Sequence, residues 1–376
     1  MTRECLLFPY LCDVIHSIMP LRCGIIGLSG CGKTTLFNSL SEHHAQTGAG
    51  TKANMGTIQV PDQRLSAINL HVKAAREVPA TVEMVDIPGL ARGGTGIGTQ
   101  FLSEIRNVDA LVHVVRCFEN SLFHHPEGSI DPLRDREIVD LELQIRDIES
   151  VEKKIQKLEK LAKSGDREAR HGIDVLHRYK THLESVHPAR TAPIPPEDRK
   201  FIADLCLLTD KPVMYLCNVD DSAASLGNSH SERFIRSVAS ENAEVLILAA
   251  MLESEIASLE LIKDRAEFLT DAGLQEPGVS RLVRAAYHLL DLQTFFTTGP
   301  KEVRAWTLTR GMTASQAAGV IHSDMERGFI RAEVMRSEDF IRLGSEHACR
   351  ESGKLMVEGR NYIVKDGDML HIRFNV

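Results

Sequence analysis

One segment of the sequence has the residue types and the spacing of a phosphate-binding loop. Residues 27–34 read GLSGCGKT, which matches the pattern G-x-x-x-x-G-K-[ST] at every fixed position. Glycines let successive backbone N–H groups converge on phosphate oxygens, and the following helix adds positive potential at its N-terminus. Lys33 is expected to reach the β- and γ-phosphates as a catalytic residue, and the Thr34 hydroxyl to ligate Mg²⁺. The nucleotide-contacting residues expected here are Ser29, Gly30, Cys31, Gly32, Lys33, Thr34 and Thr35.

An acidic motif further along the chain can complete a metal site. Asp86 to Gly89 read D-x-x-G after the apolar run VEMV. A carboxylate at the carboxyl end of a buried strand can hold Mg²⁺ through water, and the Gly89 N–H can meet the γ-phosphate as a second catalytic group. Thr51, in the polar loop GAGTKANMG, is the candidate threonine that completes the coordination, with Thr47 and Thr57 as alternatives. The sequence therefore predicts Mg²⁺ as a cofactor, with the ligands Thr34, Thr51 and Asp86.

The residue after this motif bears on the rate of hydrolysis. Leu90 stands where Ras-like enzymes place a glutamine that orients the attacking water. Because an aliphatic side chain cannot polarise water, either catalysis is slow or another group positions the water. The stretch RGGTGIG (92–98) is expected to form a mobile switch loop, with a structural hairpin as the alternative.

A fourth segment is placed to recognise the base. Asn218-Val219-Asp220-Asp221 follows the apolar run PVMYLC, where a motif N-K-x-D belongs. In that motif the asparagine braces the phosphate loop, the lysine stem covers the base, and the aspartate pairs with guanine. Here Val219 replaces the lysine, while Asp221 could still accept hydrogen bonds from guanine, so the base stays open between adenine and guanine. Ala250, after the next apolar run, is expected to contact the base.

The elements that must position these residues alternate between strands and helices. Short apolar runs bounded by Gly, Asp, Asn or charged residues predict buried parallel strands, and helical patterns lie between several of them. This alternation predicts a doubly wound α/β sheet. The predicted strands cover residues 23–26, 82–87, 110–115, 212–217 and 245–250.

Two segments depart from this alternation. Residues 135–200 carry apolar side chains at three- and four-residue steps, which predicts a long helix paired with a second one, as an antiparallel coiled-coil insertion. Its lysines and arginines between 153 and 170 form either a solvated face or an RNA contact. Residues 297–376 predict a compact α+β domain, with Asp366-Gly367 as the turn of a hairpin. The G domain is then left with residues 20–134 and 201–296, and residues 1–19 are expected to be a disordered extension or a misassigned start.

Composition limits the classes of function. The 376 residues carry a net charge of -8, which argues against indiscriminate nucleic-acid binding but leaves room for a local basic face. Eight cysteines show no C-x-x-C spacing and are expected to be reduced thiols. No run approaches the roughly 20 apolar residues of a membrane span. We expect a monomeric, cytoplasmic protein that binds neither DNA nor a membrane.

Taken together, these motifs resemble the YchF / Obg-like ATPase family over residues 20–376. The resemblance implies a G domain, a helical insertion and a C-terminal TGS (β-grasp) domain. It also implies a preference for ATP over GTP, a hydrophobic residue in place of the catalytic glutamine, as at Leu90, and association with the ribosome or ribosomal RNA. The segments that carry it are CGIIGLSGCGKTTLFNSL, VPDQRL, the stretch from DIPGL to GTQFLSEIR, DALVHVVRCFE, KPVMYLCNVDD, VRAWTLTRGMTASQAAGVIHSDMERGFIRAEV and DGDMLHIRFNV.

The chain departs from the family pattern at two positions. Gly30-Cys31 stands where the family usually has Asn-Val, so an asparagine that helps related enzymes hold potassium is absent. Asp221 replaces the glutamate with which the family's fourth motif usually ends. The sequence therefore favours an ATPase switch, with a GTPase of the same architecture and a ribosome-associated binding module with little hydrolysis as alternatives, and a small-molecule kinase last.

Overall fold

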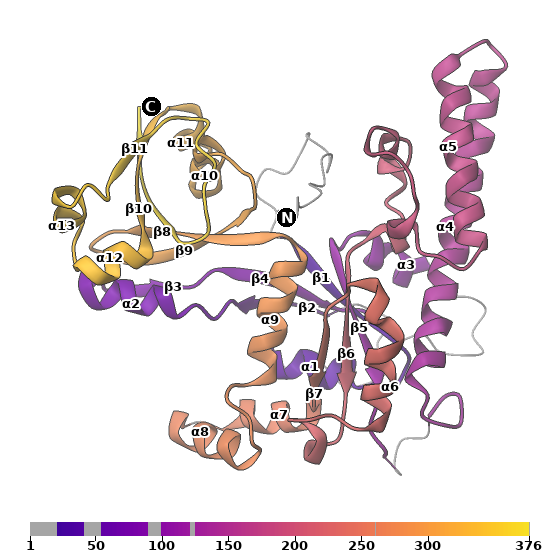
Figure 1. The fold of residues 1–376 in the computed structure, drawn as a ribbon, viewed down its shortest axis with the longest axis horizontal. Coiled ribbons are helices and arrows are strands. Elements are labelled where there is room, and N and C mark those ends of the chain that lie inside the picture. Colours follow the sequence, from indigo (N-terminus) through magenta and orange to yellow (C-terminus); the bar gives the residue numbers. More distant parts are fainter. Residues whose placement is uncertain (1–20, 41–53, 89–98, 121–124, 260, 376) are drawn as a thin grey trace.

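The first sheet is the scaffold of the phosphate-binding segments. The computed structural model describes residues 21–40, 54–88, 99–120, 125–259 and 261–375, and Figure 1 shows its arrangement. All neighbouring strands of this sheet pair in parallel except β2, which runs antiparallel to β4. In spatial order the strands are β2 (Asn54–Gln59), β4 (Thr81–Asp86), β1 (Arg22–Ile26), β5 (Ala110–Arg116), β6 (Val213–Asn218) and β7 (Val245–Leu248).

Helices cover both faces of this sheet, which confirms the predicted doubly wound α/β fold. One core packs the strands against α1 and α9, and the other packs them against α3, α4 and α6. All seven residues of β5 are buried, as expected for a parallel strand covered on both faces. The helices of this part are α1 (Lys33–Leu40), α3 (Thr99–Arg106), α6 (Ser229–Val238), α7 (Ala250–Ser258), α8 (Ile262–Asp271) and α9 (Gly278–Leu289).

The predicted helical insertion forms a long two-helix arm that projects from the sheet (Figure 1). α4 (Pro132–Ala162) and α5 (Arg167–Glu184) pack against each other, and the Asp131 and Asp166 side chains cap their N-termini. The first half of α4 packs on the sheet through Val139, whereas its second half belongs to the separate core of the arm. A series of short 3-10 turns between residues 189 and 210 returns the chain to β6.

The second sheet belongs mainly to the C-terminal part of the chain. Its strands, in spatial order, are β11 (Met356–Glu358), β10 (Phe329–Arg336), β12 (Asp368–Phe374), β8 (Leu292–Thr298), β9 (Glu302–Thr309) and β3 (Arg76–Val78). β3 comes from the middle of the first domain and pairs in parallel with β9. The expected boundary at residue 297 falls inside β8. The helices here are α10 (Ala314–Ile321), α11 (Ser323–Arg327), α12 (Ser337–Leu343) and α13 (Glu346–Glu351).

The hairpin expected at Asp366-Gly367 is wrong. β12 pairs with β10 and β8, while the residues before the turn form only an isolated bridge between Thr313 and Ile363. Tertiary hydrogen bonds fix the turn instead: Asp366 Oδ1 accepts from the Thr294 N–H at 2.9 Å, and the Gly367 N–H donates to the Thr294 carbonyl at 2.8 Å. The turn is therefore held by hydrogen bonds to β8, and it does not join two paired strands of a hairpin.

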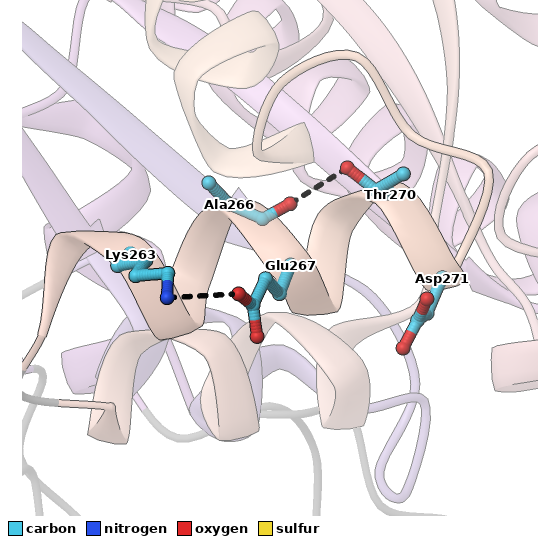
Figure 2. Close-up of a pocket in the computed structure, with 5 residues that line it drawn as sticks. All are labelled: Lys263, Ala266, Glu267, Thr270 and Asp271. Carbon is cyan, nitrogen blue, oxygen red and sulfur yellow. Dashed lines mark hydrogen bonds and ion pairs between the residues drawn. The ribbon is translucent and has the colours of Figure 1, made fainter.

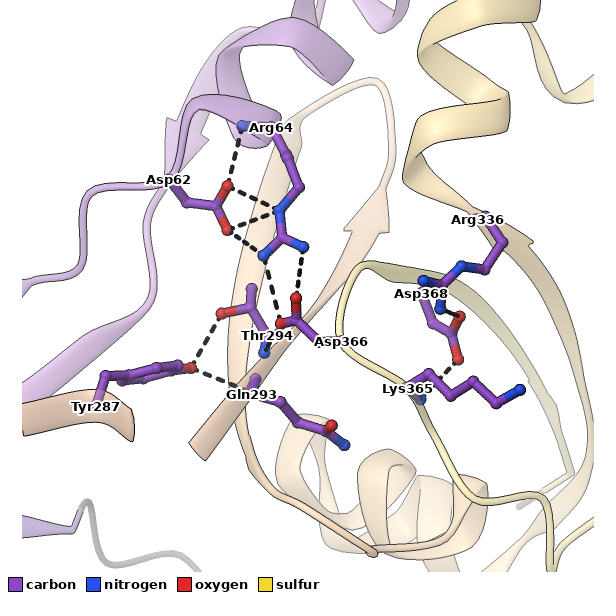
Figure 3. Close-up of polar contacts among 9 residues, drawn as sticks. All are labelled: Asp62, Arg64, Tyr287, Gln293, Thr294, Arg336, Lys365, Asp366 and Asp368. Carbon is purple, nitrogen blue, oxygen red and sulfur yellow. Dashed lines mark hydrogen bonds and ion pairs between the residues drawn. The ribbon is translucent and has the colours of Figure 1, made fainter. Parts of the chain in front are cut away.

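A polar cluster connects the start of α2 (Gln63–Val72) to the C-terminal part of the chain, as Figure 3 shows. The Arg64 guanidinium donates to Asp62 Oδ2 and to Asp366 Oδ2, both at 2.7 Å. α2 also packs against α12 and β9. Among the described residues, no helix combines the length and apolar character needed to cross a membrane.

Candidate functional site

The phosphate-binding segment forms a tight loop between β1 and α1, and its backbone needs glycine. Gly32 has φ +96°, and a β-carbon there would lie 2.2 Å from Asn218 Nδ2. Gly27 has φ +146°, and its β-carbon would lie 2.4 Å from the Val114 carbonyl oxygen. A side chain at either position would clash with its neighbours and strain the backbone. Glycine at both positions therefore allows the tight loop to form. Ser29 and Gly30 are exposed at its crest.

Lys33 closes the loop on itself. The residue is only 6 % exposed, and its ammonium donates to the carbonyls of Gly27 at 3.1 Å and Leu28 at 2.8 Å. These bonds hold a positive charge beside the backbone N–H groups of the loop, where phosphate oxygens are expected. The Cys31 thiol beneath it is buried, and burial raises its pKa although Lys33 lowers it. Cys31 is therefore suited to packing rather than to thiolate chemistry.

The predicted metal ligands Thr34 and Asp86 lie together. The Thr34 hydroxyl donates to Asp86 Oδ2 at 2.9 Å, and Asp86 is 5 % exposed at the end of β4. Burial raises the pKa of Asp86, while the Thr34 bond and Lys33 lower it. Asp86 Oδ1 is buried without a hydrogen-bond partner among the described residues. This oxygen and the Thr34 hydroxyl are hard ligands of the kind Mg²⁺ prefers, so the residues fit the predicted ion. Thr51, Gly89 and Leu90 lie outside the described residues, as does the stretch 92–98.

Asn218 ties the base end of the site to the loop. From the end of β6, its Nδ2 donates to the Cys31 carbonyl at 2.9 Å and its Oδ1 accepts from the Ala250 N–H at 2.9 Å. The structure thus brings the loop, Asn218 and Ala250 together as the sequence predicted. Val219 is buried in the apolar core, and Asp221 is exposed as the first residue of a short 3-10 turn that follows β6 after two intervening residues.

The sequence interpretation missed Arg116. This side chain at the end of β5 is 3 % exposed, and its Nη1 would lie 3.9 Å from a β-carbon on Gly30. Its guanidinium stacks over the Phe118 ring at 4.5 Å. The local signal was a cation that ends the apolar run ALVHVVR. It lies in the segment DALVHVVRCFE, which carries the family resemblance, but in none of the nucleotide-binding motifs.

A hollow on α8 does not bring together polar groups from several elements as the phosphate-binding loop does. Its volume is about 390 Å³. Figure 2 shows its lining residues, all from this one helix. Lys263 pairs with Glu267 at 3.6 Å, and the Thr270 hydroxyl donates to the Ala266 carbonyl at 2.8 Å. Because these groups satisfy one another, the hollow lacks the features of a ligand site.

Within the described part of the chain, one group of acidic and histidine side chains has the spacing of a metal site. Ligand atoms of Glu333, Glu346 and His371 lie within 4.8 Å of one another. However, Arg373 lies 3.2 Å from the Glu333 carboxylate, and its hydrogen bond holds the pKa of Glu333 below its ordinary value. Arg331 approaches the same carboxylate at 3.7 Å. These arginines already balance its charge, so the group does not fit a cation site.

Comparison with known proteins agrees with this geometry. The family model of a 50S ribosome-binding GTPase matches residues 22–164, and the YchF-GTPase_C family model matches residues 292–375. "Ribosome-binding ATPase YchF" of Haemophilus influenzae is 45% identical over 365 residues, which cover 95% of this chain and 100% of that protein. The protein of the same name from Bacillus subtilis is 43% identical over 367 residues, with the same coverage.

A solved structure gives the same result. The YchF GTPase of Schizosaccharomyces pombe superposes with a TM-score of 0.84 and is 29% identical, covering 94% of this chain and 97% of that chain. The likeness therefore extends over both sheets and the arm. The chain belongs to the YchF family.

Proposed function

We propose that this chain binds and hydrolyses ATP as a switch that acts on the ribosome. The main observation behind this proposal is that the loop 27–34, the Thr34–Asp86 pair and Asn218 meet at the carboxyl ends of the parallel strands of one sheet. Ligands of open α/β sheets bind at this edge. The names of the relatives, which combine ATPase with ribosome binding, support the nucleotide and the partner.

We assign Mg²⁺ to this site, with Thr34 and Asp86 as its described ligands and Thr51 as the ligand that completes it. The bound ion would neutralise charge on the β- and γ-phosphates. Lys33 adds a further positive charge, and we assign to the Gly89 N–H the role of a donor to the γ-phosphate. Because Leu90 cannot orient water, we expect slow hydrolysis.

ATP rather than GTP is the nucleotide we propose. Val219 is buried and offers no lysine stem to a base, which departs from the guanine-binding motif. Isothermal titration of the full chain with ATP and GTP tests this choice. GTP binding tenfold tighter, equivalent to roughly 1.4 kcal/mol, would establish the GTPase alternative.

Lys33→Ala tests the site itself. The change removes the ammonium that the Gly27 and Leu28 carbonyls hold, so the loop keeps its N–H donors but loses the charge. ATP affinity is expected to fall below detection, whereas Thr34→Ala should chiefly remove the dependence on Mg²⁺. Hydrolysis at the unaltered rate by Lys33→Ala would refute the assignment.

The ribosome contact is proposed for the basic side of the arm. Lys153, Lys157 and Lys160 are exposed on α4, whereas Lys154 turns toward Asp204 in an ion pair. Phosphate contacts release counterions, so binding should weaken steeply between about 50 and 200 mM salt. Replacing the three exposed lysines by glutamate should reduce co-sedimentation with ribosomes and leave ATP turnover of the isolated protein intact.

A charge-matched control separates the arm from overall charge. Arg233, Arg236 and Lys263 have side chains that are 63%, 77% and 84% exposed on α6 and α8, and their replacement by glutamate changes the net charge equally. This control should retain ribosome binding. An equal loss of ribosome binding in both variants would refute the arm contact. Ribosome binding that survives the three arm replacements and does not change with salt would refute it as well.

The remaining assignments follow from the same proposal. We divide the chain into a G domain (20–134 and 201–296), a helical insertion (135–200) and a C-terminal TGS domain (297–376) that contributes to the ribosome contact. We place the protein in the cytoplasm as a monomer. Size-exclusion chromatography with light scattering measures the oligomeric state, and a dimer mass would correct it.

A further inference from the structure

The fourth motif of this chain has no lysine beside the phosphate-binding loop. In N-K-x-D motifs a lysine from the strand that also carries the asparagine lies against the loop and the base. Here Val219 takes that position, is 3 % exposed, packs in the apolar core and donates its N–H to the Leu248 carbonyl at 3.0 Å. The strand β6 therefore supplies the asparagine of this motif and no cation.

The neighbouring strand supplies a cation at the same edge. Arg116 is the register partner of Asn218 in the parallel pairing of β5 with β6, so both side chains leave the sheet at one level. Asn218 braces the Cys31 carbonyl at 2.9 Å, and Arg116 Nη1 lies beside Gly30, 3.9 Å from where its β-carbon would be. The ends of β5 and β6 thus lie next to two consecutive residues of the phosphate-binding loop, Gly30 and Cys31.

The Arg116 guanidinium is held in place before any nucleotide arrives. Its Nε donates to the Phe118 carbonyl at 3.2 Å, its Nη2 donates to the Asn120 carbonyl at 3.5 Å, and its plane lies 4.5 Å over the Phe118 ring. These contacts hold the guanidinium at the Gly30 side of the loop. A buried, preorganised arginine binds phosphate more effectively than a flexible lysine, because little conformational entropy remains to be lost.

We propose that Arg116 contacts the phosphate chain of the bound nucleotide and supplies a cation where the fourth motif lacks one. Its Nη1 donates to a phosphate oxygen at the Gly30 side of the loop, next to the Cys31 carbonyl that Asn218 braces. The ligand class is a nucleoside di- or triphosphate, and the inference rests on the nucleotide site proposed above.

Calorimetry on the full chain tests the contact with ATP, ADP and adenosine. Arg116→Gln should weaken ATP and ADP binding by about tenfold to a hundredfold, the range for a hydrogen bond to a charged group, and leave adenosine binding unchanged. Arg116→Lys, which keeps the charge, should bind both nucleotides within about tenfold of the wild type. This second variant also provides the test if Arg116→Gln does not fold.

A matched control and the contrary outcomes complete the experiment. Arg304 also lies on a strand and stacks on an aromatic ring, with its guanidinium 4.0 Å over Trp306, but it belongs to the second sheet. Arg304→Gln should bind all three ligands as the wild type does. Unchanged ADP affinity in Arg116→Gln, or an equal loss of ADP and adenosine affinity, would overturn the inference. A wild-type chain that binds neither ATP nor GTP would instead overturn the proposed function.

Discussion

Replacing Asn218 by alanine removes two buried hydrogen bonds with one change. The side chain is 4 % exposed and joins the Cys31 carbonyl to the Ala250 N–H, each at 2.9 Å. Deletion leaves a buried acceptor and a buried donor without their partner, and each such group costs about 1–3 kcal/mol. Asn218→Ala should therefore lower the free energy of unfolding by about 2–6 kcal/mol and release the phosphate-binding loop.

Urea unfolding followed by far-UV circular dichroism measures this loss as a lower midpoint at an unchanged slope. Asn218→Asp keeps the acceptor for the Ala250 N–H but turns a carboxylate oxygen toward the buried Cys31 carbonyl, so its midpoint should fall at least as far as that of the alanine variant. Asn361→Ala is the matched control, because Asn361 is exposed and should change stability by less than about 0.5 kcal/mol. A loss below about 1 kcal/mol in Asn218→Ala would show that the brace is not the connection that holds the loop.

Three further changes probe other parts of the chain. Gly32→Ala should abolish nucleotide binding and cost about 1–3 kcal/mol more than Gly165→Ala, because Gly165 has the same kind of backbone (φ +95°) but open space around it; calorimetry and urea midpoints measure both. Burial raises the pKa of Asp147 to about 6, so the folded chain binds the extra proton between about pH 4 and 6 and stability falls by about 3 kcal/mol as pH rises through that window. Asp147→Asn should remove this slope, and parallel pH profiles would contradict the assignment. Arg64→Ala should lower the free energy of unfolding by about 1 kcal/mol, whereas Arg236→Ala, which removes an exposed ion pair, should change it very little. Equal urea midpoints of the two variants would mean that the cluster between α2 and the C-terminal part of the chain contributes no stability.

The sequence predicted the central strands because burial on both faces leaves a continuous apolar run. Residues 110–115 were predicted as a strand, and β5 covers Ala110–Arg116 with every residue buried. By contrast, β3 has the sequence Arg-Glu-Val and mostly exposed side chains, so no hydrophobic pattern marks it. Its partner β9 lies more than 200 residues away in the chain. Local patterns cannot reveal a pairing that only tertiary structure creates.

The wrong hairpin and the missed arginine have related causes. The Asp366-Gly367 pair carries a genuine turn signal, but Asp366 uses its carboxylate for the Thr294 N–H and for Arg64, which connect the turn to distant segments. Arg116 belongs to none of the nucleotide-binding motifs, and its position beside Gly30 follows from the pairing of β5 with β6. The phosphate-binding loop and Asn218 could be predicted because their chemistry depends on local spacing.

The pairing of β3 with β9 has a consequence for dissection of the molecule. A fragment that begins at Leu292 would lose residues 76–78 and leave the backbone of β9 as an open edge beside Val303. It would also lose α2 and α9, so Phe296 and Met369, now fully covered, would face water. Open edges and fresh apolar surface favour self-association. In a pull-down experiment, such a fragment would therefore bind other proteins non-specifically through the surface that the truncation exposes. A chimera that carries this domain would also need residues 62–78.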